Sequence, residues 1–159
     1  MAIPAHLWIT DESGSPIKGS SLVKGREGSI EVLGFSHALH TLADGVTGAL
    51  MGSRVHSPMT IEKEFDRVSP FLYRAVARGL PLQTAVLNWY RIDDSGTEQA
   101  YFTIRMENIR VVTVQPQMHN IKDNDMRHLN HIEQVELRYR KIEWTYLDGN
   151  ISFSDAWGS

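Results

Sequence analysis

Cysteine is absent from this chain of 159 residues. Its absence excludes disulfides, thiolate zinc sites and cysteine nucleophiles. Long apolar runs are absent too, since none approaches the roughly 20 residues of a membrane span. The first ten residues lack the positive start and the apolar core of roughly 7 to 15 residues that a secretory signal requires. We therefore expect a soluble cytoplasmic protein that does not insert into membranes and that, if exported, leaves the cell without a cleaved signal.

An excess of basic charge is also lacking, because 16 lysines and arginines face 19 aspartates and glutamates, for a net charge of -3. Proteins that bind a phosphate backbone tightly usually carry a basic stripe, so no nucleic-acid partner is expected. No serine lies in a Gly-x-Ser-x-Gly elbow, and no Gly-x-Gly-x-x-Gly or phosphate-binding lysine motif occurs. The sequence thus gives little support for an enzyme.

Strand periodicity is clearest between residues 132 and 157. Apolar residues fall on odd numbers from Val135 to Tyr139 and on even numbers from Ile142 to Tyr146. Either an extra residue sits near Arg140 or the buried face switches there, so that one strand serves two sheets. We predict a bulge or bend within about two residues of Arg140.

Turn and helix signals punctuate the rest of the chain. Asp148-Gly149 predicts a hairpin with a primed two-residue turn, which needs positive φ at both positions. Ser69 and Pro70 predict a helix start, with the serine oxygen as the cap, and Gly79 predicts its end, giving one short helix over about residues 70–78.

Other alternating segments bring the count to about eight strands, with no β-α-β alternation. They lie at residues 5–9, 29–35, 58–65, 86–92, 102–106 and 109–114. The fold class predicted is mainly β: a single-domain barrel of two packed antiparallel sheets with one flanking α-helix. All of residues 1–159 belong to that domain.

The least regular segment covers residues 41–57 and contains three glycines. A glycine-rich loop of this length is uncommon in a compact domain unless it is functional or disordered. Its apolar Val46, Leu50 and Met51 favour a partner over disorder. The alternative is a loop folded back over its own barrel.

One cluster has residue types suited to catalysis. It consists of His119, Asp123, Asp125, His128 and His131. Histidine and carboxylate are ligands for zinc or iron, so a metal-dependent β-barrel enzyme is the alternative function. No closed ligand pattern occurs, and interleaved asparagines favour a solvated loop whose side chains bond its own backbone.

Aromatic residues at strand spacing suggest a third function, a ligand-binding module that stacks bases or sugars. They are Trp89, Tyr90, Tyr101, Trp144 and Tyr146. Aromatic residues in this pattern are more often part of a core, which is the simpler interpretation.

Several segments, spread in one order along almost the full chain, resemble the haemolysin-coregulated (Hcp) family, the tube proteins of type VI secretion systems. The segments are residues 31–37, 52–58, 63–66, 118–121 and the closing hairpin 130–150. The resemblance implies a β-barrel subunit that assembles into six-membered rings. Such rings stack into a tube, are expelled with sheath and spike components, and hold small effector proteins in the lumen. It implies neither catalysis nor a cofactor.

Positions carried over from the family give the expected site residues. The protruding loop 41–57 would contact a neighbouring subunit or ring through Val46, Leu50, Met51, Arg54 and His56. Ser36 would contact cargo at the lumen-facing end of a strand, although it would equally bond the local backbone. The chain stops just past the barrel, so we expect no C-terminal toxin extension. The protein would be cytoplasmic before firing and would then reach the medium or a target cell.

Overall fold

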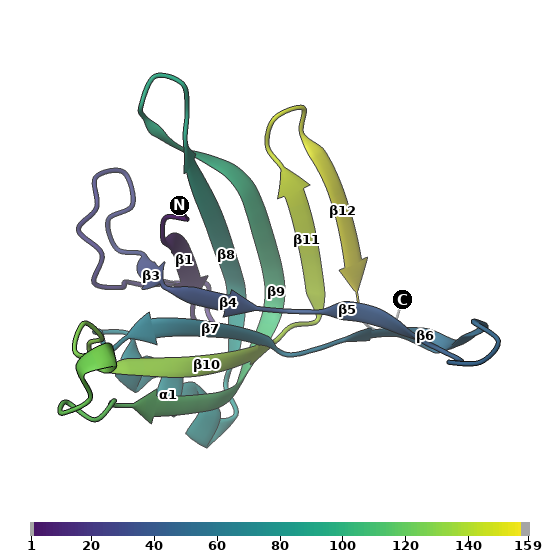
Figure 1. Ribbon diagram of the computed structural model, residues 1–159, viewed down its shortest axis with the longest axis horizontal. Coiled ribbons are helices and arrows are strands. Elements are labelled where there is room, and N and C mark those ends of the chain that lie inside the picture. The colour runs from purple at the N-terminus through teal and green to yellow at the C-terminus, as the bar shows by residue number, and fades with distance from the viewer. Residues whose placement is uncertain (1, 157–159) are drawn as a thin grey trace.

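The computed structural model describes residues 2–156 and shows a curved sheet with a long hairpin projecting from it (Figure 1). The described part contains twelve strands, one α-helix and a short 3-10 turn. In chain order they are β1 (Ala5–Thr10), β2 (Pro16–Ile17), β3 (Ile30–Val32), β4 (Gly34–Ser36), β5 (Leu39–Ala43), β6 (Leu50–His56), β7 (Met59–Glu64), α1 (Ser69–Arg78), β8 (Pro81–Ile92), β9 (Glu98–Gln117), η1 (Asn124–Met126), β10 (Ile132–Arg138), β11 (Lys141–Tyr146) and β12 (Ile151–Ala156).

Two antiparallel sheets form, one of ten strands and one made of β5 and β6 alone. The large sheet runs β2-β1-β8-β9-β10-β7-β4, and the 20-residue β9 pairs with β10 along one part and with β11 along another. β3 pairs with β1, near one end of this strand order, and β4 pairs with β7, near the other end. The segment 30–36 therefore connects the two sides of the sheet. The expected mainly-β fold with one helix is confirmed.

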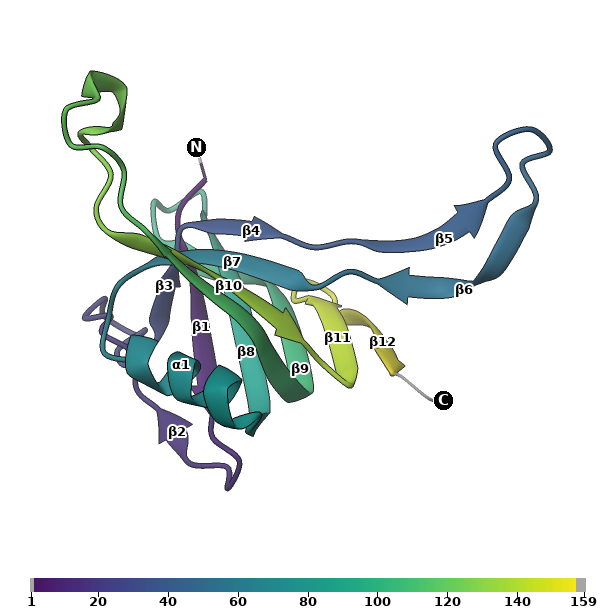
Figure 2. The same cartoon turned by 90° about the horizontal axis from the view of Figure 1, so that it is seen from below.

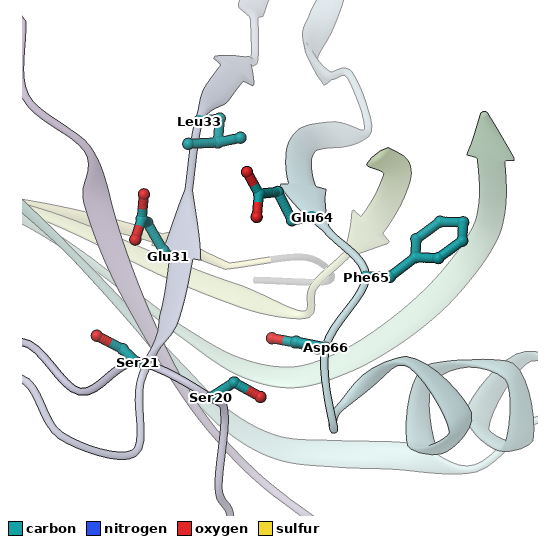
Figure 3. A pocket seen from close by; sticks show the side chains of 7 residues that line it. All are labelled: Ser20, Ser21, Glu31, Leu33, Glu64, Phe65 and Asp66. Atoms are coloured by element: carbon teal, nitrogen blue, oxygen red, sulfur yellow. The ribbon is translucent and has the colours of Figure 1, made fainter. Parts of the chain in front are cut away.

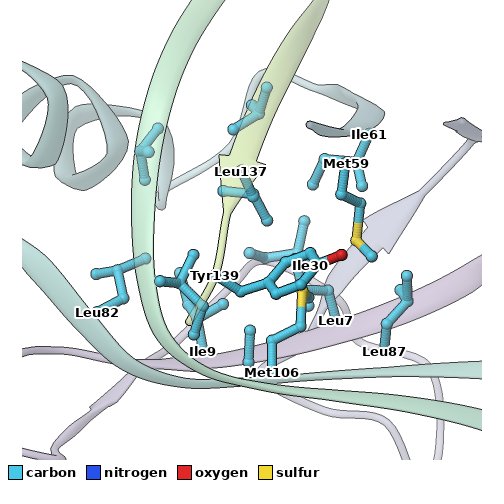
Figure 4. Close-up of a cluster of buried hydrophobic side chains, with 14 of the residues drawn as sticks. Leu7, Ile9, Ile30, Met59, Ile61, Leu82, Leu87, Met106, Leu137 and Tyr139 are labelled. Atoms are coloured by element: carbon cyan, nitrogen blue, oxygen red, sulfur yellow. The ribbon is translucent and has the colours of Figure 1, made fainter. Parts of the chain in front are cut away.

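The core lies inside the curve of the large sheet (Figure 4). Alternate residues of the main strands supply it, as periodicity predicted, including Leu7 and Ile9 of β1 and Val135 and Leu137 of β10. The helix α1 lies against β9 and buries Leu72 and Ala75. Each apolar side chain removed from water contributes about 1.5–3 kcal/mol to the free energy of folding. The core is therefore the main source of stability.

The helix has the predicted span, but its N-terminus differs from the prediction. The cap position is Val68 and has no side-chain hydrogen bond. Ser69 Oγ instead donates to the buried Glu133 Oε1 at 2.6 Å and accepts from Asp66 N at 3.1 Å. At the other end Gly79 adopts φ +61°, the left-handed conformation expected for a helix-terminating glycine.

The predicted irregularity at Arg140 is present as a bend between β10 and β11. Arg140 N donates to the carbonyl oxygens of Glu107 and Asn108 at 3.1 and 3.2 Å, and Asn108 has φ +53°. Pairing with β9 shifts by one residue between Glu136 and Leu137 and then keeps one register from Leu137 to Tyr146, across the bend. Asn108 and Arg140 are thus opposite one another. The alternation of buried and exposed residues shifts at the same place in both strands.

The buried face does not switch at this bend, which corrects the idea that one strand serves two sheets. Tyr139 and Ile142 enter the same core, as do Met106 and Ile109 on β9. The alternation of inward and outward side chains shifts by one residue in both strands at this position. The sheet is creased there, and the apolar side chains stay on its inner face.

The closing hairpin is confirmed, but its turn is longer than predicted. Tyr146 pairs with Ile151, leaving four residues in the loop, and Asn150 N donates to Leu147 O at 3.1 Å. Positive φ occurs at Gly149 and Asn150 rather than at Asp148 and Gly149. The asparagine accepts this conformation because its short polar side chain tolerates it.

Candidate functional site

The β5–β6 hairpin extends well beyond the barrel, and the segment expected as an irregular loop is largely strand (Figure 2). Every residue of these two strands is exposed except His56. A two-stranded hairpin is marginally stable in water without packing support. This one pairs only with itself, and it displays large apolar side chains that a monomer leaves in water: Leu42, Val46, Leu50, Met51 and Val55.

The hairpin tip has a defined conformation. Asp44 Oδ1 accepts from the backbone N–H groups of Val46 and Thr47 at 2.7 and 2.9 Å. These bonds, Thr47 first, lower the pKa of Asp44. Val46, which follows Asp44 by two residues, is held at the apex with 97% of its surface exposed. The tip therefore presents an apolar side chain from a structured turn.

The root of the hairpin is fixed to the barrel by ionic contacts. Arg54 Nε and Nη2 donate to the two carboxylate oxygens of Asp155, both at 2.8 Å, and Nη2 also donates to Ala156 O at 3.0 Å. His56 Nε2 lies 2.8 Å from Asp155 Oδ2. The Arg54 guanidinium, followed by His56, holds the pKa of Asp155 well below its usual range. This carboxylate stays charged throughout the neutral range and joins β6 to β12.

Two of the five expected interface residues therefore make contacts within the chain. His56 is buried and bonds to Asp155 and Tyr139. Arg54 remains partly exposed beside its carboxylate. These two position the hairpin, and the exposed Val46, Leu50 and Met51 are the ones available to a neighbour.

Replacing Asp155 with asparagine is expected to loosen the hairpin without unfolding the barrel. The amide cannot hold the guanidinium with two charged oxygens, so the charge-assisted bonds from Arg54 are weakened. Amide hydrogen exchange over residues 39–56 should become about two- to fivefold faster. Asp94→Asn, at an exposed turn on the β8–β9 hairpin, is the control and should change nothing; equal exchange in both variants would contradict the anchoring role.

A second apolar surface is formed by residues of β4, β8, β9 and β11. A shallow groove of about 400 Å³ is lined by Phe35, His37, Trp89, Tyr101, Phe102, Ile104 and Trp144. The rings of Phe35 and Trp89 meet edge to face at 5.0 Å. Trp89, Phe102 and Trp144 pack against the core while remaining partly exposed, so these aromatic residues extend the core beyond the barrel. Leu33 and Phe35 are 46% and 40% exposed.

Ser36 is exposed at the last position of β4, where it pairs with Thr60. A smaller hollow of about 150 Å³ lies elsewhere, between β3 and the segment that leads into α1 (Figure 3). Glu31, Glu64 and Asp66 line it. Glu64 accepts from Asn130 and Asp66 accepts from Lys63, so these two carboxylates already have partners.

The histidine-rich connection between β9 and β10 has no converging ligands. Among residues 2–156, no group of three or more His, Asp or Glu side chains is placed to hold a metal ion. Asp123 Oδ1 accepts from Asp125 N at 3.0 Å and Asn120 Oδ1 accepts from Lys122 N at 3.0 Å. The loop thus bonds its own backbone, and the metal-enzyme alternative gains no support. No helix within the described residues is long and apolar enough to cross a membrane.

Comparisons with known proteins agree on one family. A family model described as "Type VI secretion system effector, Hcp" matches residues 6–146. The major exported protein of Pseudomonas aeruginosa is 35% identical over 168 residues, covering 100% of this chain and 98% of the relative. The Hcp1 structure from the E. coli EAEC 042 pathovar has a TM-score of 0.89 at 51% identity, covering 98% of this chain and 99% of that one. The secreted protein Hcp3 from Pseudomonas aeruginosa has a TM-score of 0.77 at 30% identity, with 98% and 99% covered.

Proposed function

The chain belongs to the Hcp family of type VI secretion systems, and from this premise we propose that it is a ring-forming subunit of the secreted inner tube. Rings of six copies would stack inside the contractile sheath and leave the cytoplasm with the spike when the apparatus fires. The proposed role is structural, with no catalysis and no cofactor.

The observation that carries the proposal is the exposed hairpin β5–β6. Its apolar side chains are exposed in the described chain, and its root is fixed to the barrel by Arg54 and Asp155. Such a projection gains stability when another molecule covers it.

The partner we propose is another copy of the same chain. The subunit carries a projecting apolar hairpin and, separately, an open aromatic groove, which are two different surfaces. Contacts between different surfaces of identical subunits are heterologous, and they close into a ring when the rotation divides a full turn. Edge strands such as β12, which pairs only with β11, would also be covered in such a ring.

Effector binding in the lumen is the second part of the proposal. Ser36 is exposed at a strand end and is available to a cargo protein, as its position in the family pattern suggests. Many weak contacts of this kind would discriminate cargo without a deep pocket.

Purified protein is expected to form a ring-sized species. Light scattering at micromolar concentrations should report an assembly several times the mass of the 18.0 kDa chain, and electron microscopy should show rings with an open centre. A strictly monomeric species across that concentration range would contradict the proposed function.

A further inference from the structure

The root of the hairpin contains a hydrogen-bonded row that the tube function does not itself require. His37 Nε2 lies 2.8 Å from Tyr139 Oη, and His56 Nδ1 lies 2.5 Å from the same oxygen. His56 Nε2 continues the row to Asp155 Oδ2 at 2.8 Å. His37 precedes β5 and His56 ends β6, so the row joins both strands of the hairpin to the barrel.

The donors and acceptors in this row follow from chemistry. A carboxylate only accepts, so His56 Nε2–H donates to Asp155. In a neutral His56 the remaining Nδ1 is an acceptor, and the Tyr139 hydroxyl donates to it. Tyr139 Oη then accepts from His37 Nε2–H. The three hydrogen bonds of the row are thus mutually compatible.

This pattern tolerates one added proton but not two. Protonation of His37 at Nδ1 keeps every bond of the row. Protonation of His56 requires the hydroxyl to turn and donate to His37, which then needs its other tautomer. With both imidazoles charged, Tyr139 Oη faces two N–H donors, its own hydrogen has no acceptor in the row, and two cations lie on either side of a buried oxygen.

The surroundings make that second charge costly. Tyr139 and His56 are buried, so water does not solvate a second charge at this hydroxyl. The charged groups that act on the row are Asp155 from β12, Arg54 from β6 and Arg138 from β10. Asp155 is already engaged by Arg54, so its charge is shared between two cations when His56 is protonated.

We infer that His37, Tyr139 and His56 form a pH-sensitive latch, which holds the root of the β5–β6 hairpin at neutral pH and weakens in acid because the one shared hydroxyl cannot satisfy two charged imidazoles. Acidification would then increase the motion of the hairpin relative to the barrel. A weakening of self-assembly in acid rests additionally on the proposed function.

The sign of the pH dependence follows from His37. Burial, and then the charge of His56, lower the pKa of His37 in the folded protein. The stabilisation is therefore complete above the unfolded value of about 6.5 and declines as the pH falls below it. One additional proton taken up on opening gives up to about a tenfold change in the opening equilibrium per pH unit. Burial, and then the charge of Asp155, raise the pKa of Tyr139, so the phenol keeps its proton throughout.

The test is amide hydrogen exchange of residues 39–56 between pH 7 and pH 5, corrected for the intrinsic pH dependence of exchange. Opening should rise by up to about tenfold per pH unit in the native protein and stay flat in His37→Gln, whose amide still donates to the tyrosine. His40→Gln, on the exposed surface of β5, is the matched control and should behave as the native protein does. Exchange of residues 81–92 in β8 reports that the barrel stays folded.

Tyr139→Phe provides an independent arm. Without the hydroxyl the two histidines are uncoupled, so the hairpin should open readily at pH 7 and respond little to acid. A flat native profile, or the same rise in His37→Gln as in the native protein, overturns the latch. Light scattering on the same samples separates the latch from ring assembly. If the latch exists but rings do not form, hydrogen exchange responds to pH while the measured mass stays constant at every pH.

Discussion

Replacing Glu133 with alanine is expected to lower the free energy of unfolding by about 3 kcal/mol. Glu133 and Lys63 pair across β10 and β7, and their side chains are 1% and 0% exposed. Removing one member of a buried ion pair leaves the other charge without compensation. Lys63 keeps a contact with Asp66 at 3.0 Å, which limits the loss to the lower end of the range for buried pairs.

The same pair should be replaceable as a unit. The double variant Lys63→Met with Glu133→Leu removes both charges and fills the site with apolar atoms, so its stability should lie within about 1 kcal/mol of the native protein or above it. Glu133 Oε2 has no hydrogen-bond partner among the described residues, so one desolvated oxygen is removed as well. Glu136→Ala, on the same strand but partly exposed, is the control and should change stability by less than about 0.5 kcal/mol.

Urea unfolding at one fixed protein concentration measures these differences, because the proposed association would make apparent stability depend on concentration. If Glu133→Ala and Glu136→Ala lose the same amount, the buried pair carries no special energy. A double variant as unstable as the single one would show that the site needs its charges.

Introducing aspartate at both Val46 and Leu50 should weaken self-association by about a hundredfold or more. These side chains are 97% and 74% exposed in one chain, and burying each against a neighbour would contribute about 1.5–3 kcal/mol. Their loss alone therefore amounts to at least about 3 kcal/mol, and every 1.4 kcal/mol is about tenfold in affinity. Carboxylates in an apolar contact add a desolvation cost.

The design separates association from folding. Asp44 holds the tip through backbone N–H groups, so the turn does not depend on the Val46 side chain. Leu22→Asp is the matched control, since Leu22 is 91% exposed on a different loop. Sedimentation or light scattering over a dilution series measures the midpoint of assembly, and an unchanged midpoint in the hairpin variant would remove the tip from the interface.

The burial of Lys63, one member of the buried ion pair, follows from the sequence pattern. Met59 and Ile61 alternate on the buried face of β7, and the same period places Lys63 on that face. The period also predicted burial of Phe65, but β7 ends at Glu64 and Phe65 is 49% exposed. Periodicity identifies a face only while the strand continues, and β7 ends one residue before Phe65.

The two strands of the hairpin show what periodicity cannot detect. Residues 39–56 have no buried face apart from His56, so no alternation of apolar and polar residues marks β5 and β6. Their apolar residues did indicate a surface in need of a partner, because exposed apolar area is unfavourable whatever the backbone does.

The sequence by itself determined the inner faces of the main strands, the end of the helix at Gly79, the closing hairpin and the family, because period, turn chemistry and motif order are local properties of the chain. Only the tertiary structure decided which distant residues meet. His37 reaches Tyr139 across 102 positions and Arg54 reaches Asp155 across 101. Those contacts depend on strand order and on a crease shared by neighbouring strands, and neither is encoded in any single segment.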